Sequence, residues 1–136
     1  MTVPNDLLGR AVEFHGHLGP FLVLGLRAGL LGTHYLGKSH FELKATVETS
    51  ARPPRSCFID GLQFSSGCTT GKGNLKVRTG SSISVEFTGG GRSLRIGVKD
   101  QILEMLDSLS SEEQVEALSR EMLEKTDDEL FSVKTE

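Results

Sequence analysis

Two histidines lie two residues apart in the segment Phe14-His15-Gly16-His17-Leu18-Gly19-Pro20. In an extended segment, side chains at this spacing project to the same side. Gly19 and Pro20 fit the N-cap and the first position of a helix, so the paired imidazoles are expected at a helix N-terminus. The free N–H groups and the dipole at such an end favour anions. The segment therefore predicts a site for a metal ion or an anionic ligand that includes His15 and His17.

A second group of polar side chains lies between Cys57 and Gln63. If a helix begins after the preceding prolines, Cys57, Asp60 and Gln63 fall at positions i, i+3 and i+6 and share roughly one face. A thiolate, a carboxylate and an amide on one stripe could ligate a metal or perform acid–base chemistry. The alternative is a buried cysteine with hydrogen-bonded polar neighbours, since free cysteine is among the most buried residue types.

A third segment, Gly67-Cys68-Thr69-Thr70-Gly71-Lys72-Gly73-Asn74, is a polar loop with a thiol, two hydroxyls and an amine. It is not a phosphate-binding P-loop, because the glycine spacing is too short and no Ser or Thr follows Lys72. Lys72 could lower the pKa of Cys68 and so maintain a nucleophilic or ligating thiolate. A structural turn is the alternative, and a nucleophile pair of either cysteine with His17 also stays open. His34 and His40 are interpreted as residues without function.

The periodicity of apolar residues predicts an α+β fold in which helices pack on one face of an antiparallel or mixed sheet. The segment 20–36 is apolar nearly all round, which is typical of a long helix that is buried on several sides. Its Gly25, Gly29 and Gly32 would let another backbone approach closely, either the sheet or a second copy. The other expected helices span 5–14, 100–109 and 110–123, and the expected strands span 41–50, 75–79, 83–87, 94–98 and 130–133.

Composition and charge favour a single soluble domain over residues 1–136. The net charge of −3 gives no electrostatic reason to expect a nucleic-acid or membrane partner. No secretion signal is evident, and the longest apolar stretch is interrupted by Arg27, so a cytoplasmic location is expected. In a reducing compartment, the two cysteines favour metal binding, catalysis or burial over a disulfide. One small domain can hardly cover the helix 20–36, which predicts a homodimer.

Together and in this order, the segments 14–20, 57–63 and 67–75 resemble the signature blocks of the FmdE family of formylmethanofuran dehydrogenase proteins. The resemblance covers about residues 5–100. It implies an α+β core domain, commonly dimeric, with a metal site. It also implies a larger molybdenum or tungsten enzyme, which fixes carbon dioxide onto methanofuran, as a partner. The residues implied to line the metal site are His17, Cys57 and Cys68, with His15, Asp60, Gln63 and Lys72 close by.

Two departures from the family pattern matter. The first block of the family usually has the sequence His-Gly-His-x-Cys-Pro, whereas this chain has Gly19 in place of the cysteine. A cysteine at this helix N-cap would be stabilised as a thiolate. Gly19 removes that ligand and leaves bare N–H groups with room for water or an anion. Longer members also carry a C-terminal cysteine-rich zinc module, which is not expected here because no cysteine follows Cys68.

The resulting hypothesis is a protein that binds a divalent metal ion, expected to be zinc, through His15, His17, Cys57 and Cys68. Three protein ligands and one open position are typical of a reactive or substrate-binding centre. In a catalytic site, Asp60 would act as a base and Lys72 would neutralise an anionic substrate. The groups expected to contact that substrate are Gln63, Thr69 and Gly19.

Two alternatives stay open. The first is an accessory protein that hands a metal or cofactor to a larger enzyme without catalysis of its own. The second is a thiol-dependent enzyme that needs no metal. Loss of the cysteine at position 19 argues against redox chemistry, because two neighbouring thiols cannot form at that helix N-terminus.

Overall fold

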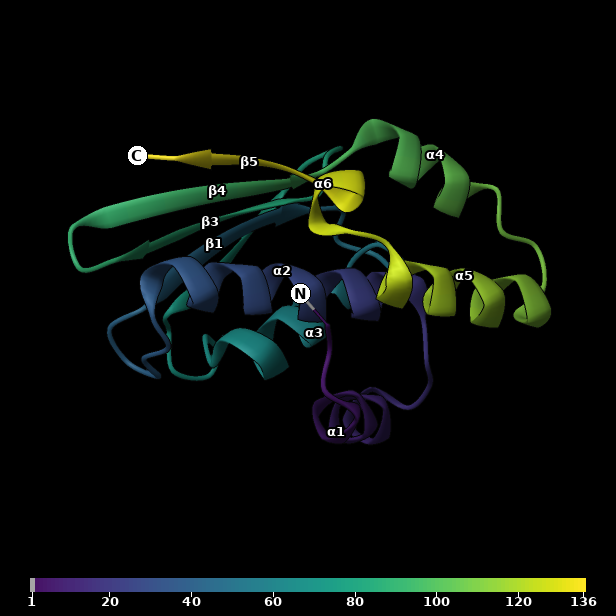
Figure 1. The fold of residues 1–136 in the computed structure, drawn as a ribbon, viewed down its shortest axis with the longest axis horizontal. Coiled ribbons are helices and arrows are strands. Elements are labelled where there is room, and N and C mark those ends of the chain that lie inside the picture. The colour runs from purple at the N-terminus through teal and green to yellow at the C-terminus, as the bar shows by residue number, and fades with distance from the viewer. Residues whose placement is uncertain (1) are drawn as a thin grey trace.

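A five-stranded mixed sheet forms one layer of the computed structural model, which describes residues 2–136 (Figure 1). The strand order is β2-β1-β3-β4-β5, in which β1 and β2 are parallel and the other pairs are antiparallel. Buried and exposed side chains alternate along β1, β3 and β4, so one sheet face packs on the core and the other meets solvent. The strands are β1 (Lys44–Thr49), β2 (Leu75–Thr79), β3 (Ser84–Gly89), β4 (Arg92–Val98) and β5 (Phe131–Thr135).

Six helices accompany the sheet in the described part of the chain, and the α+β prediction is confirmed. The central helix α2 packs against β3 and β4 on one side and against α3 and α5 elsewhere (Figure 1). None of the described helices is both long and apolar enough to span a membrane. The helices are α1 (Asn5–His15), α2 (Pro20–Leu36), α3 (Cys57–Ser66), α4 (Asp100–Asp107), α5 (Glu112–Glu124) and α6 (Asp127–Leu130).

Helix α2 begins as its sequence predicts, with Gly19 at the N-cap and Pro20 at the first position. Twelve of its 17 residues are buried. Its surface is not uniformly apolar, however, because the buried set includes Arg27 and the last turn exposes His34 and Tyr35. The helix is therefore a core element that also carries one buried charge.

The glycines of α2 allow a very close approach of α3 rather than of the sheet backbone or a second copy. A Cβ atom at Gly25 would lie 2.1 Å from the carbonyl oxygen of Phe58, and one at Gly61 would lie 2.1 Å from that of Leu22. At Gly29, a Cβ would meet the Ser65 hydroxyl at 1.8 Å. These positions are filled within one chain, so the glycine pattern is not evidence for the predicted homodimer.

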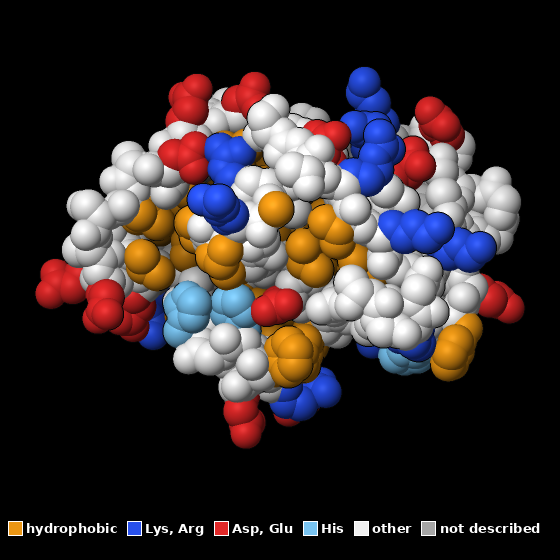
Figure 2. All heavy atoms as spheres, turned by 180° about the vertical axis from the view of Figure 1, so that it is seen from behind, with side chains coloured by type: hydrophobic (Ala, Val, Ile, Leu, Met, Phe, Trp, Pro, Cys, Tyr) orange, Lys and Arg blue, Asp and Glu red, His pale blue; other side chains and the backbone are white. Residues whose placement is uncertain are grey.

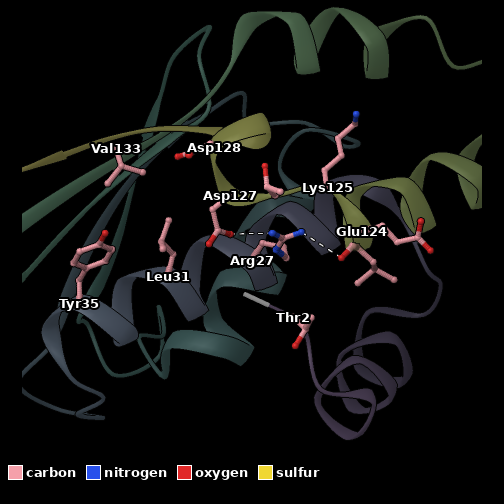
Figure 3. A pocket seen from close by; sticks show the side chains of 11 residues that line it. Thr2, Arg27, Leu31, Tyr35, Glu124, Lys125, Asp127, Asp128 and Val133 are labelled. Atoms are coloured by element: carbon pink, nitrogen blue, oxygen red, sulfur yellow. Dashed lines mark hydrogen bonds and ion pairs between the residues drawn. The ribbon is translucent and has the colours of Figure 1, made fainter.

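Arg27 connects α2 to the C-terminal helices (Figure 3). Its guanidinium donates from Nη1 to the backbone oxygens of Met122 at 2.8 Å and Leu123 at 3.3 Å, and from Nη2 to Asp127 Oδ1 at 2.9 Å. The sequence suggests that Asp127 belongs to a solvated acidic face, and this interpretation is wrong. Its partner lies 100 residues away in the sequence, beyond the reach of local patterns.

Local turn and capping signals account for the remaining boundaries. Gly90 and Gly91 both have positive φ in the β3–β4 hairpin, which is the conformation that their sequence predicts. Helix α5 is capped by Ser111, whose hydroxyl accepts from the backbone N of Gln114, one residue later than the capping box that the sequence indicates. A capping box is instead present at the start of α6, where hydrogen bonds from Thr126 hold the pKa of Glu129 below its ordinary value.

Candidate functional site

The first two predicted segments meet where α1 ends and where α2 and α3 begin. His15 is the last residue of α1, and Gly16 ends that helix with a φ of 106°, which favours glycine. The two histidines are thus not in one extended segment, yet their rings are close, with centroids 4.9 Å apart. The turn at Gly16 produces the proximity that the sequence predicts for His15 and His17.

Asp60, in the first turn of α3, fixes the orientation of the His15 ring. Its Oδ2 lies 2.6 Å from His15 Nδ1, while the His15 side chain is only 9% exposed. The opposite ring nitrogen, Nε2, is buried and has no hydrogen-bond partner among residues 2–136. When Nδ1–H donates to the carboxylate, Nε2 of the neutral ring carries a lone pair. A buried polar atom without a partner is costly, which marks Nε2 as an atom prepared for a ligand.

His15 borders a pocket of about 400 Å³ together with His17, Gly19 and Cys57. Figure 2 shows two adjoining histidine side chains on this face, with an acidic side chain and a group of apolar side chains beside them. The pocket volume lies within the usual range for small-ligand sites, about 300–1,000 Å³. The other lining residues, mostly apolar, are Pro20, Phe21, Leu22, Pro54, Leu106, Asp107, Leu109 and Val115.

The Cys57 thiol is the third potential metal ligand in this pocket. Burial raises the pKa of this thiol, and the negative charge of Asp60 raises it further. In the absence of a cation, Cys57 is therefore a protonated thiol at neutral pH and a weak nucleophile. This protonation state does not favour a thiol enzyme that works without a metal.

Asp60→Asn should accelerate the reaction of Cys57 with iodoacetamide in mildly alkaline buffer. Removal of the carboxylate charge lowers the pKa of the thiol, so a larger fraction is thiolate at a given pH. In both proteins the rate should rise with pH, and the wild-type rise should come at the higher pH. Intact-mass spectrometry over a pH series measures the rate. Cys57→Ser is the control and should stay unmodified while folded, because Cys68 is fully buried. An equal or slower reaction in Asp60→Asn would contradict this electrostatic assignment.

The third predicted segment lies at the opposite end of α3. Gln63 Oε1 accepts from the backbone N of Thr70 at 3.0 Å, and Lys72 Nζ donates to the carbonyl of Gly67 at 2.6 Å. The backbone N of Thr69 donates to Asn74 Oδ1 at 2.9 Å. Gln63, Thr69 and Lys72 thus stabilise the loop itself rather than face the pocket at the other end of the helix.

Cys68 does not reach the pocket of His17 and Cys57 in this structure. The ten residues of α3 separate the two cysteines, a helix length of about 15 Å. Cys68 is buried in the core, where its Sγ lies 3.3 Å from the carbonyl oxygen of Leu43. Burial raises the pKa of Cys68 and outweighs the opposing effect of Lys72, so the predicted thiolate is not supported.

The three remaining donors share a pocket but do not form a complete metal shell. Among residues 2–136, no group of three or more His, Cys, Asp or Glu side chains is arranged to hold a metal ion. His15, His17 and Cys57 do supply suitable nitrogen and sulfur donors, and the unpartnered Nε2 of His15 fits such a role.

Sequence reasoning missed two features of this region. Leu106, Leu109 and Val115, from α4 and α5, form an apolar wall of the pocket, and Asn74 organises the third segment through bonds to the carbonyls of His40 and Leu43. No sequence spacing relates the apolar wall to the histidines. An asparagine that closes a glycine-rich loop is, by contrast, a recognisable turn signal.

The fold and this pocket are those of an FmdE-type α+β domain. Residues 14–132 match the family described as "FmdE, Molybdenum formylmethanofuran dehydrogenase operon", and the chain belongs to that family. The crystal structure of an FmdE-like protein of tungsten formylmethanofuran dehydrogenase type, from Syntrophus aciditrophicus, has the same fold. It superposes with a TM-score of 0.67 at 20% identity, over 96% of this chain and 70% of that one.

A curated relative matches a shorter segment. It is described as a probable S-adenosyl-L-methionine-binding protein of Archaeoglobus fulgidus, and it is 37% identical over 71 residues. The match covers 51% of this chain but only 19% of the relative, so the chain spans about a fifth of the length of that protein.

Proposed function

We propose that this FmdE-family domain binds a divalent metal ion, with zinc as the first candidate, through His15, His17 and Cys57. The observation that carries the proposal is the buried Nε2 of His15, which has no partner among the described residues although Asp60 holds the ring in place. Imidazole and thiolate are the donors that zinc prefers. The proposal omits Cys68, which the resemblance implies as a ligand, because α3 separates it from the other donors.

Asp60 has a positioning role in this proposal rather than the role of a base. Metal-binding histidines commonly donate their second ring N–H to a carboxylate, which fixes the tautomer and strengthens the ligand. The 2.6 Å contact between His15 Nδ1 and Asp60 Oδ2 has this form. A bound cation would also favour the thiolate of Cys57 and so displace its proton.

Three protein ligands would leave a position for a small ligand in the 400 Å³ pocket. A divalent ion there would supply polarisation of a carbonyl group or activation of water. Membership of the family supports a role beside formylmethanofuran dehydrogenase, either as one component of that enzyme or as an accessory metal protein. The homodimer and the cytoplasmic location stay predictions.

Metal analysis of site variants tests the proposal. The protein is stripped with a chelator, incubated with zinc, desalted and analysed by mass spectrometry for metal per chain. We expect one zinc ion in the wild type and in the controls His34→Ala and Cys68→Ser. The ion should be lost in His15→Ala and Cys57→Ser, and Asp60→Asn should weaken binding by about 10- to 100-fold. Cobalt substitution adds a second measurement, since the thiolate–cobalt absorption band should disappear in Cys57→Ser.

Two results would overturn the proposal. One is the absence of stoichiometric zinc in the folded wild type. The other is retention of zinc by both His15→Ala and Cys57→Ser. Loss of zinc from a folded Cys68→Ser variant would restore the ligand set implied by the family resemblance. Circular dichroism of each variant establishes that it is folded.

A further inference from the structure

The N-terminus of α2 opens into the same pocket and has no cap. Gly19 offers no side chain at the N-cap, Pro20 has no N–H, and the first turn holds no acidic residue. The first backbone bond of the helix runs from Val23 N to the carbonyl oxygen of Gly19 at 3.1 Å. Among residues 2–136, the N–H groups of Phe21 and Leu22 therefore have no acceptor.

These two N–H groups lie at the pocket. Phe21 and Leu22 both border it, while their side chains are buried in two different hydrophobic clusters, so the backbone at the start of α2 faces the space. Unsatisfied N–H groups at a helix N-terminus bind anions, because the donors point outward and the dipole adds partial positive charge.

A second, independent observation points to a ligand at the same place. The unpartnered Nε2 belongs to a His15 side chain that is 9% exposed and borders this pocket. The two carboxylates nearby are already paired. Asp60 bonds to His15, and Asp107 accepts from Arg55 Nη2 at 2.6 Å. An anion that enters the pocket would thus meet donors rather than unpaired negative charge.

The rest of the pocket defines what the anion should carry. Leu106, Leu109 and Val115 line it from α4, from the residues after α4 and from α5, and they supply no hydrogen-bonding side chain. A ligand that uses the whole pocket needs one charged end and a short apolar chain. Bare inorganic anions would leave the apolar wall uncovered.

We propose that the pocket takes a small aliphatic carboxylic acid. Its carboxylate would accept from the N–H groups of Phe21 and Leu22, and its chain would lie against Leu106, Leu109 and Val115. This inference rests on the proposed function, since it names the substrate class of the same pocket, but it assigns the anion to backbone donors of this chain and not to the metal.

Titration with butanoate tests the inference, with butanamide as the uncharged matched compound. The amide signals of Phe21 and Leu22 are followed by NMR at constant ionic strength, with and without zinc. We expect saturable shifts of both signals with butanoate and no comparable shifts with butanamide. Gly19→Asp would place a capping carboxylate on the same N–H groups and should weaken butanoate binding by about tenfold or more. Gly9→Asp adds the same charge on the open surface of α1, where nothing lies within 4 Å, and should bind like the wild type.

The outcomes separate this inference from the proposed function, because zinc per chain is measured on the same samples. Stoichiometric zinc without saturable butanoate shifts would overturn the carboxylic-acid inference alone. Equal shifts with butanamide, or unchanged binding in Gly19→Asp, would also overturn it. Butanoate shifts in a protein that binds no zinc would uphold the carboxylate site and overturn the metal proposal.

Discussion

Gly25→Ala should leave the protein largely unfolded. A Cβ atom at this position would lie 2.1 Å from the carbonyl oxygen of Phe58 and 2.8 Å from the backbone N of Leu62. Both atoms belong to the backbone of α3, so no side-chain rotation can relieve the overlap and the two helices must separate. We expect a loss of about 3 kcal/mol or more in the free energy of unfolding, a large share of the stability of a small domain. Urea denaturation followed by circular dichroism measures it.

The reciprocal glycine and an exposed glycine provide the comparison. Gly61→Ala should be as damaging, because its Cβ would meet the carbonyl oxygen of Leu22 at 2.1 Å. Gly9→Ala lies in α1 with nothing within 4 Å and should stabilise the protein by about 0.5–1 kcal/mol through helix propensity. A Gly25→Ala protein with the wild-type denaturation midpoint would show that α2 and α3 do not cross at this distance.

Asp127→Ala should cost about 2–4 kcal/mol in the free energy of unfolding, because it leaves the buried guanidinium of Arg27 without its carboxylate partner. The Arg27 side chain is 1% exposed and that of Asp127 is 24% exposed, so solvent can compensate only a little. The two carbonyl bonds to α5 would remain, but they do not neutralise the charge. The expected result is a lower denaturation midpoint and earlier detachment of the C-terminal helices, seen by hydrogen exchange in α5.

A double variant distinguishes the buried charge from simple loss of contacts. Adding Arg27→Met to Asp127→Ala should recover most of the lost stability, because an apolar side chain of similar length needs no partner. Glu116→Ala removes the exposed pair with Arg120, at 3.1 Å on the surface of α5, and should change the free energy by about 0.5 kcal/mol or less. If Asp127→Ala has as little effect as Glu116→Ala, the pair does not anchor the C-terminal helices.

Sequence periodicity predicts the elements of this fold well but not their partners. Alternation along residues 44–49 and 84–98 indicates which side of each strand is buried, yet it does not show that β1 pairs in parallel with β2. The glycines of α2 indicate a close approach without naming α3. In the sequence, Arg27 only interrupts an apolar stretch, because its acceptors lie about a hundred residues away.

The candidate site shows the same division between local and distant information. The pairing of His15 with His17, and the Gly19–Pro20 helix start beside them, follow from local sequence. That Cys57 shares their pocket and Cys68 does not depends on the path of α3, which spacing cannot reveal. The apolar wall from α4 and α5 depends on tertiary packing alone.

The parallel pairing of β1 with β2 through α3 makes this part of the chain a βαβ unit. In such units, ligands are typically bound beyond the carboxyl ends of the strands, whereas the opposite edge serves stability. Cys57 follows the connection that leaves the carboxyl end of β1, and Cys68 precedes the amino end of β2. Insertions or exchanges in the connection 50–56, which contributes Pro54 to the pocket, could therefore alter ligand choice while the sheet and its core stay intact.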